Sequence, residues 1–161
     1  MTEHSDDVAK LAELTKDIRI AMLTTVDENG HFTARPMAQQ QVEPDGSLWF
    51  FAERDAHVVT HIGANPHVGV ALSSGDSWVS INGTAAVVDD LEKKRELWNT
   101  VVEAWLPQGA EDPRVVLIRV ESESAEYWDT PGGRVASVFS FVKAKVTGEP
   151  YQGTENAKIE L

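Results

Sequence analysis

The sequence of 161 residues contains no cysteine. Disulfide bonds, thiolate nucleophiles and metal sites with cysteine ligands are therefore excluded. The missing cysteine also fits a reducing compartment, and we expect a cytoplasmic protein. Residues 1–20 include several acidic side chains and no apolar run long enough for a signal peptide or a membrane span. We therefore expect no association with a membrane.

Basic residues are also scarce. Lysine and arginine number 14 against 26 aspartates and glutamates, which gives a net charge of −12. Nucleic acids and anionic membrane surfaces are bound by basic surface, so neither is an expected partner. The length and the 42% of hydrophobic residues are typical of one globular unit, and we expect a single domain over residues 1–161.

Sequence motifs of several common chemistries are missing. The chain has no glycine-rich dinucleotide fingerprint, no P-loop, no nucleophile elbow and no H-E-x-x-H zinc motif. His57 and His61 are four residues apart on an expected helix, with His67 nearby, a spacing that alone would allow a metal site. We favour solvated polar positions, because the pattern places no third ligand.

What the chain does contain is a series of short β-rich runs separated by turn sequences. A first helix is expected from a cap at Ser5 to about Asp17, and Asn29-Gly30 predicts a hairpin. Pro36 lacks an N–H, so its strand should lie at a sheet edge or bulge, and Gly83 should mark a bulge or a close backbone approach. Strands are expected at residues 20–26, 31–42, 48–52, 68–72, 78–88, 115–120, 125–129 and 138–146, and helices at residues 57–64 and from Asp89 or Asp90 to about Trp105.

This order of elements predicts a mainly β fold. The strands do not alternate regularly with long helices, so a doubly wound parallel sheet is not expected. An antiparallel barrel or sandwich with helices packed outside accounts better for the pattern.

One strand has an unusual polar composition. Arg35 is followed by three consecutive amides, Gln39, Gln40 and Gln41. An arginine can pair a phosphate or carboxylate through two hydrogen bonds, and amides can bind the edge of a flat heterocycle. A solvent-facing edge strand accounts for the pattern equally well.

Several sequence runs resemble the FMN-binding split-barrel family of pyridoxamine 5′-phosphate oxidase. They are Arg35-Pro36-Met37, Leu48-Trp49-Phe50-Phe51 and Asn65-Pro66-His67-Val68. Later runs are similar to the general stress protein 26 branch of that family. They are Gly83-Thr84-Ala85, Val88-Asp89-Asp90, Glu96-Leu97-Trp98, Trp105-Leu106-Pro107, Asp112-Pro113, Ala125-Glu126-Tyr127-Trp128-Asp129 and the tail from Thr147 to Leu161.

The resemblance implies a six-stranded antiparallel Greek-key barrel and a homodimer with FMN in a cleft at the subunit interface. Arg35 would face the phosphate, Trp78 would come from the partner subunit, and Trp128 would pack beside the isoalloxazine ring. The cofactor-binding residues that it implies are Arg35, Pro36, Met37, Gln39, Gln40, Phe51, Arg54, His57, Trp78 and Trp128. The aromatic residues Trp49, Phe50, Phe51 and Trp78 also exceed what one small barrel readily hides, which favours a dimer.

Two departures from the family pattern bear on function. Ala52, Ala56 and Val58 stand where the family has two hydroxyls and an ammonium on the phosphate, so Arg54, His57 and the helix start would have to take over part of that role. Arg134 stands where the oxidase has a substrate arginine, but Ala136 replaces the histidine that follows it. Oxidation of pyridoxamine phosphate is therefore not expected.

The sequence thus predicts an FMN-binding stress-type protein, a flavin-dependent oxidoreductase on an unidentified small molecule. Two alternatives stay open. One is a non-enzymatic split-barrel stress protein with a degenerate phosphate site. The other is a binder of the deazaflavin F420, whose phosphate would be placed differently.

Overall fold

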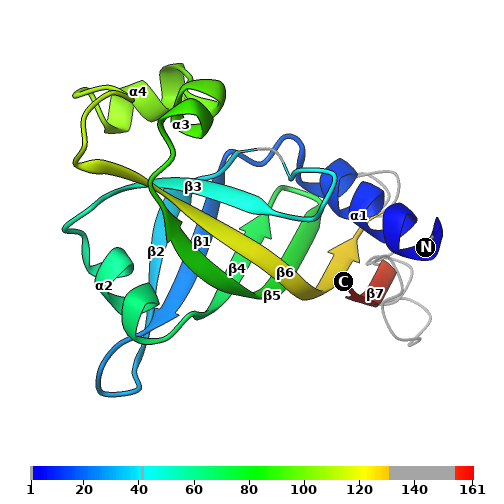
Figure 1. Cartoon of the computed structure of the whole chain (residues 1–161). Coiled ribbons are helices and arrows are strands. Elements are labelled where there is room, and N and C mark those ends of the chain that lie inside the picture. The colour runs from blue at the N-terminus through cyan, green and yellow to red at the C-terminus, as the bar shows by residue number, and fades with distance from the viewer. Residues whose placement is uncertain (1, 41, 131–154) are drawn as a thin grey trace, which may run out of the picture.

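The computed structural model describes residues 2–40, 42–130 and 155–161. Its strands are β1 (Ile20–Val26), β2 (Phe32–Ala38), β3 (Leu48–Glu53), β4 (His67–Ser73), β5 (Ser77–Val88), β6 (Val115–Asp129) and β7 (Glu155–Glu160). Its helices are α1 (Thr2–Thr15), α2 (His57–Ala64), α3 (Leu91–Leu97) and α4 (Thr100–Trp105). Every strand pairing is antiparallel, which confirms the mainly β fold class (Figure 1).

Six strands form a barrel that is split along one seam. They follow the order β2-β1-β4-β5-β6-β3, and β7 pairs with β6 beside this path. Among the described residues, the two end strands meet at one bridge, between Gln39 and Phe50, next to a hydrogen bond from the Gln40 N–H to the Trp49 carbonyl at 3.2 Å. Apart from that bridge, the described residues of β2 and β3 do not pair with each other, which leaves an opening between the two strands.

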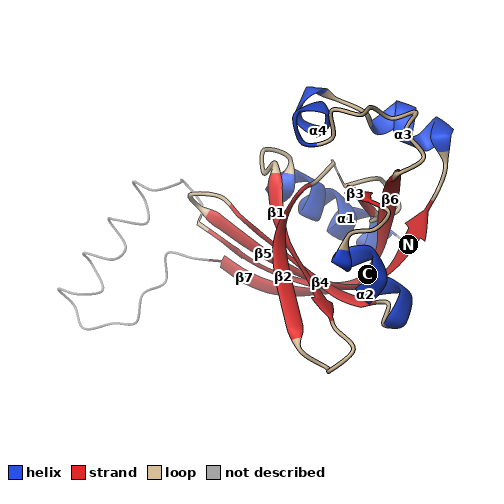
Figure 2. Ribbon diagram, turned by 90° about the vertical axis from the view of Figure 1, so that its left-hand side faces the viewer, coloured by secondary structure: helices blue, strands red, loops and turns tan. Residues whose placement is uncertain are grey.

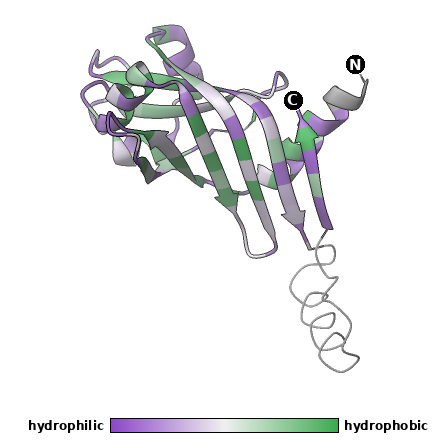
Figure 3. Ribbon diagram, turned by 90° about the horizontal axis from the view of Figure 1, so that it is seen from below, coloured by the Kyte–Doolittle hydropathy of each residue, from purple (hydrophilic) through white to green (hydrophobic). Residues whose placement is uncertain are grey.

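The strands fill the barrel with apolar side chains. Along β1 and β4 buried and exposed residues alternate, as a sheet with one buried face requires, and Figure 3 shows the resulting bands of hydropathy. Leu23, Phe50, Ile81 and Ile118 are fully buried at the centre. Helices α1 and α2 add Val8, Leu11, Val58 and Ile62 to the same cluster.

A second apolar cluster lies outside the barrel, beneath α3 and α4. Trp49 and Phe51 point outward from β3 into it and pack with Val102, Leu106 and Leu117. Phe51 also meets Trp98 edge to face, with ring centroids 5.3 Å apart. Because Phe50 lies inside the barrel, the three β3 aromatics are all covered by their own chain. The expectation that they form surplus aromatic surface is therefore wrong, and only Trp78 of that set is exposed.

Two local backbone predictions are confirmed. Pro36 lies on β2, the end strand of the sheet order. At Gly83 the pairing of β5 with β6 shifts register. A Cβ on Gly83 would collide with the Glu121 carbonyl and lie 3.0 Å from Val120 Cγ1, so close backbone approach requires glycine there.

Other boundaries differ from the expectation. The first helix begins at Thr2, ahead of Ser5, because residues 2–5 contain no glycine or proline to stop it. The helix expected up to Trp105 is two helices, since Trp98 and Asn99 are extended and the Asn99 side chain accepts from the N–H groups of Val101 and Val102. Residues 115–129 form one long strand because β5 pairs with residues 117–129 and β3 pairs with residues 115–120.

Three further points complete the comparison with the sequence. Strand β7 was not predicted. The strand expected at residues 138–146 and the residues Arg134 and Ala136 lie outside the described residues. Among the described residues, no helix is both long and apolar enough to cross a membrane.

Candidate functional site

A cavity of about 280 Å³ lies at the opening between β2 and β3. Its walls come from β2, the end of β3, the start of α2, and α4. In Figure 1, α4 lies above β3 and α2 lies below it on the same side of the barrel. The lining residues are Arg35, Pro36, Met37, Ala38, Phe51, Ala52, Glu53, Ala56, His57, Val58, Val102, Trp105 and Leu106.

Arg35 provides a guanidinium at the wall of this cavity. It stands opposite Leu23 in the register of β1 and β2, and its Nη1 donates to the Leu23 carbonyl at 3.2 Å. Its Nη2 is buried and has no hydrogen-bond partner among the described residues. Burial lowers the pKa of Arg35 below its usual value, although an arginine stays protonated in proteins. The side chain therefore keeps an unused donor for an acceptor in the cavity.

The start of α2 lies on the same cavity. Ala56 is its N-cap, with an extended backbone (φ −67°, ψ 146°) and no side-chain hydrogen bond to the first turn. The first N–H groups of a helix have no intrahelical acceptor and carry partial positive charge. With His57 on the wall beside it, this end of the cavity suits an anionic group.

The positions that depart from the family pattern are mostly packing positions here. Ala52 and Val58 expose only 6% and 4% of their surface and belong to the barrel core. Ala56 is partly buried against that core. Glu53, which also lines the cavity, accepts a hydrogen bond from Gln108 and adds negative charge.

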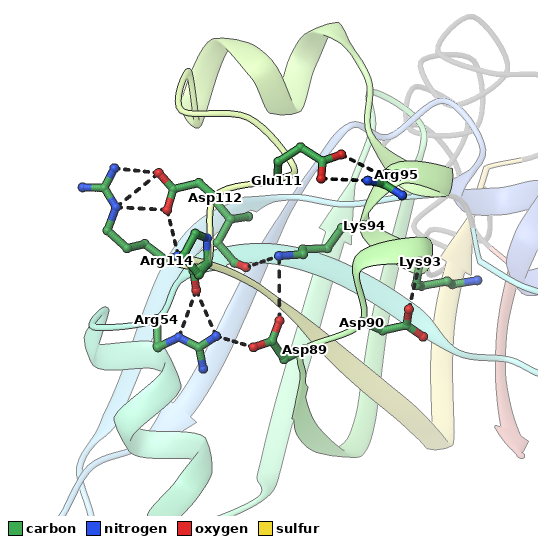
Figure 4. A network of polar contacts seen from close by, with 11 residues as sticks. Arg54, Asp89, Asp90, Lys93, Lys94, Arg95, Glu111, Asp112 and Arg114 are labelled. Atoms are coloured by element: carbon green, nitrogen blue, oxygen red, sulfur yellow. Dashed lines mark hydrogen bonds and ion pairs between the residues drawn. The ribbon is translucent and has the colours of Figure 1, made fainter.

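Arg54 does not line the cavity. Its guanidinium pairs with Asp89 and donates to the Pro113 carbonyl from Nε at 3.0 Å and from Nη2 at 2.9 Å (Figure 4). The hydrogen bond from Arg54 is the main reason why the pKa of Asp89 lies below its usual value. These contacts hold the segment before β6 against the end of β3. The Arg54 side chain is therefore not directed at the cavity.

The two glutamines point elsewhere. Gln39 is turned inward toward α1, where its Nε2 donates to the Ile18 carbonyl at 2.7 Å. Gln40 accepts a hydrogen bond from Asn99 Nδ2 at 2.8 Å. Both residues line a neighbouring cavity instead.

Trp78 and Trp128 lie apart from Arg35 within the chain. They stand directly opposite each other on β5 and β6, and neither lines the cavity. Trp78 is 46% exposed. One chain thus brings together Arg35, Pro36, Met37, Phe51 and His57 of the expected set, and leaves Gln39, Gln40, Arg54, Trp78 and Trp128 outside the cavity.

The cavity wall from α4 was missed as part of the site. Val102, Trp105 and Leu106 close one side of it, and Trp105 remains 64% exposed (Figure 2 shows α4 at the end of the barrel). The helical spacing of these apolar residues was visible in the sequence. Nothing in that spacing showed which face of the helix covers a cavity.

The histidines are placed by helix α2. His61 Nδ1 lies 2.9 Å from Oγ1 of the buried Thr25, and the rings of His57 and His61 are 6.3 Å apart. Among the described residues there is no cluster of three side chains able to hold a metal ion.

The arrangement fits a flat, largely apolar ligand with one anionic end. Apolar walls from β2, β3 and α4 suit a ring system, and Arg35 and the start of α2 suit its anionic group. The volume of about 280 Å³ is slightly below the range of roughly 300–1,000 Å³ common for complete ligand sites.

Comparisons with known proteins find relatives over most of the chain. The sequence profile of the family described as "Pyridoxamine 5'-phosphate oxidase like" matches residues 6–152. Protein bli-3 of Neurospora crassa is 28% identical over 144 residues, covering 82% of this chain and 69% of that protein.

Solved structures agree with this. A candidate general stress protein 26 from Jannaschia sp. CCS1 superposes with a TM-score of 0.79 at 25% identity, over 97% of this chain and 99% of that chain. The general stress FMN/FAD binding protein of Xanthomonas citri has a TM-score of 0.64 at 32% identity, over 80% of this chain and 90% of that chain.

Proposed function

The chain belongs to the pyridoxamine 5′-phosphate oxidase-like family, in its general stress protein 26 branch, and from this premise we propose that it binds FMN at the opening between β2 and β3. The observation that carries the proposal is the buried Nη2 of Arg35, a donor at the cavity wall with no partner among the described residues. A phosphate oxygen would satisfy it. The FMN/FAD binding relative from Xanthomonas citri supports the same ligand class.

In this proposal, the different walls of the cavity contact different parts of the flavin. Arg35, His57 and the first N–H groups of α2 hold the phosphate, whereas Met37 and Phe51 contact the ring system. Trp105 and Leu106 shield the ring from water. When bound, the flavin supplies the electron or hydride transfer, and the protein supplies position and electrostatics. We propose an oxidoreductase acting in the cytoplasm on a small molecule.

A second copy of the chain completes the site in this proposal. Ile20 and Met22 on β1 and Trp78 on β5 are large apolar residues that stay 41–46% exposed. The register places Met22 opposite Pro36 on one side and Ala71 on the other, so the exposed face is continuous across β2, β1 and β4. Burying such a face between two copies would bring Trp78 of the partner subunit to the cavity.

The test is a separate titration of the protein with FMN, riboflavin and F420, each followed by its fluorescence and visible spectrum. Saturable binding of about one FMN per chain supports the proposal. Binding of neither flavin contradicts it and favours the non-enzymatic alternative, whereas binding of F420 alone favours the deazaflavin alternative.

The oligomeric state is tested separately. Light scattering at micromolar concentration should give a dimer for the wild type and a monomer for Met22→Glu, which places a charge on the apolar face. The control is Glu28→Gln, an exposed position in the turn after β1, which should remain a dimer. A monomeric wild type would contradict the shared site.

A further inference from the structure

A second cavity, of about 250 Å³, adjoins the proposed flavin cavity. It lies between the end of α1, the end of β2 and the start of α4. Ala38 lines both cavities. Val102 lines the flavin cavity, and the adjacent Val101 lines the second cavity. A molecule in the second cavity would therefore be a direct neighbour of a ligand in the first.

The charge of this second cavity is opposite to that of the rest of the protein. Its lining includes the cations Lys16 and Arg19 and no carboxylate. The flavin cavity contains Glu53, and two other surface cavities contain Glu43 with Glu96 and Glu13 with Asp129. In a chain with a net charge of −12, a cavity that is lined by cations and by no carboxylate attracts anions locally.

Arg19 has its guanidinium available. The Lys16 Nζ lies 2.9 Å from Glu13 Oε1 in an ion pair, whereas Arg19 forms no ion pair with any described residue. Its backbone carbonyl accepts from the Gln39 N–H at 3.0 Å, so the backbone is fixed while the side chain is exposed. Arginine can grip a carboxylate through two parallel hydrogen bonds.

Gln39 adds an unsatisfied acceptor to the same wall. It exposes only 8% of its surface, and its Nε2 donates to the Ile18 and Thr15 carbonyls. Its Oε1 is buried and has no donor among the described residues. Buried acceptors are nearly always hydrogen-bonded, so this oxygen points to a ligand that brings its own O–H or N–H.

Gln40 and Asn99 also line this cavity, and hydrogen bonds fix the orientation of their side-chain amides. The Asn99 amide donates to Gln40 Oε1, while its own Oδ1 accepts from two N–H groups of α4. With Gln40 Oε1 held by Asn99, the amide nitrogen of Gln40, a residue of the cavity lining, is a further donor. Arg19 and Gln40 thus offer side-chain donors on this wall, as expected for a site that binds an anion.

We propose that this second cavity binds a small organic anion that also carries a hydroxyl or N–H donor, and that this is the substrate class of the protein. Arg19 and Gln40 donate to the anionic group, and Gln39 Oε1 accepts from the donor. The assignment as substrate rests on the proposed function, because it places the flavin in the neighbouring cavity. Anion binding itself does not require the flavin.

The test uses three small probes on the full-length protein, with and without FMN, at constant ionic strength. Lactate carries both the anion and the hydroxyl, propionate lacks the hydroxyl, and lactamide lacks the charge. Calorimetric titration should give the tightest binding for lactate, about tenfold weaker binding for propionate, and weaker binding still for lactamide.

Variants locate the site. Arg19→Gln should weaken lactate about tenfold or more, whereas Lys158→Gln, which removes the same charge from exposed strand β7, should leave it unchanged. Equal effects of the two variants, no preference among the probes, or no binding of any probe would overturn the proposal. Lactate binding in a protein that binds no flavin would support the anion site and refute the flavin proposal, so the two failures are distinguishable.

Discussion

The ammonium of Lys94 is buried and donates a hydrogen bond of 2.9 Å to the carbonyl of Val115. Lys94 lies on α3, Val115 begins β6, and the Lys94 side chain is only 3% exposed. Asp89 stands 3.8 Å from the same ammonium and also pairs with Arg54 (Figure 4). Because α4 follows α3 closely in the chain, this contact on α3 helps to hold α4, which forms one wall of the proposed flavin cavity.

Replacing Lys94 with methionine should destabilise the protein. The change keeps the length of the side chain but leaves the buried Val115 carbonyl without its donor, which costs about 1–3 kcal/mol. Urea unfolding measures the difference. Lys158→Met on exposed β7 is the matched control and should leave the free energy of unfolding unchanged. A Lys94→Met protein as stable as the wild type would show that the contact contributes nothing.

Ala56 offers a test of the phosphate end. Ala56→Ser and Ala56→Asp both supply the missing side-chain cap of α2 and should each stabilise the protein by about 0.5–2 kcal/mol. Ala64→Ser, at the exposed far end of the helix, should not. If the flavin phosphate lies at this helix start, Ala56→Asp also weakens FMN by charge repulsion while Ala56→Ser does not. Equal FMN affinities of the two variants would place the phosphate elsewhere.

The close approach at Gly83 gives a paired prediction. Gly83→Ala should destabilise strongly, because its new methyl group would collide with the Glu121 backbone. Gly63→Ala, inside α2 with nothing within 4 Å of the new methyl, should stabilise by about 0.4–1 kcal/mol. Thermal unfolding of the two variants should shift in opposite directions. A neutral Gly83→Ala would mean that β5 and β6 separate easily there.

Asp112 should contribute to acid sensitivity. Hydrogen bonds from the Arg114 side chain and N–H lower the pKa of Asp112 from 3.8 to about 2. Above pH 3.8 the carboxylate is ionised in both the folded and the unfolded state, and its stabilisation is complete. Between pH 3.8 and about 2 the unfolded state takes up the proton first, so stability falls. Asp112→Asn should flatten the dependence of stability on pH in that window, and an unchanged slope would contradict the assignment.

Local backbone rules predicted much of the fold. Pro36 marked an end strand, Gly83 marked the bulge, and the antiparallel class followed from the turn sequences. The break at Asn99 was missed because a heptad-like apolar pattern continues across it, while the capping role of an asparagine depends on the backbone around it. The order and spacing of sequence runs were enough to indicate the family.

The site was harder to predict because side-chain direction depends on tertiary packing. Arg35, Gln39 and Gln40 look like one polar strand in sequence, yet Gln39 turns inward to α1 and Gln40 bonds to Asn99. Arg54 is paired with Asp89, which lies 35 residues away in the chain, and no local sequence signal connects the two. Trp78 and Trp128 would reach the cavity only through a second copy.

The central claim is tested most directly by the ratio of the dissociation constants for riboflavin and FMN in the wild type and in Arg35→Gln, measured by quenching of flavin fluorescence. Arg35 is the only lysine or arginine on the described cavity wall, so the preference of the wild type for FMN should depend largely on it. Losing a charged hydrogen bond of about 1.5–3 kcal/mol should weaken FMN by roughly tenfold or more and leave riboflavin unchanged. The account predicts that the ratio falls about tenfold or more in Arg35→Gln; an unchanged ratio, or no binding of either flavin by the wild type, would contradict it.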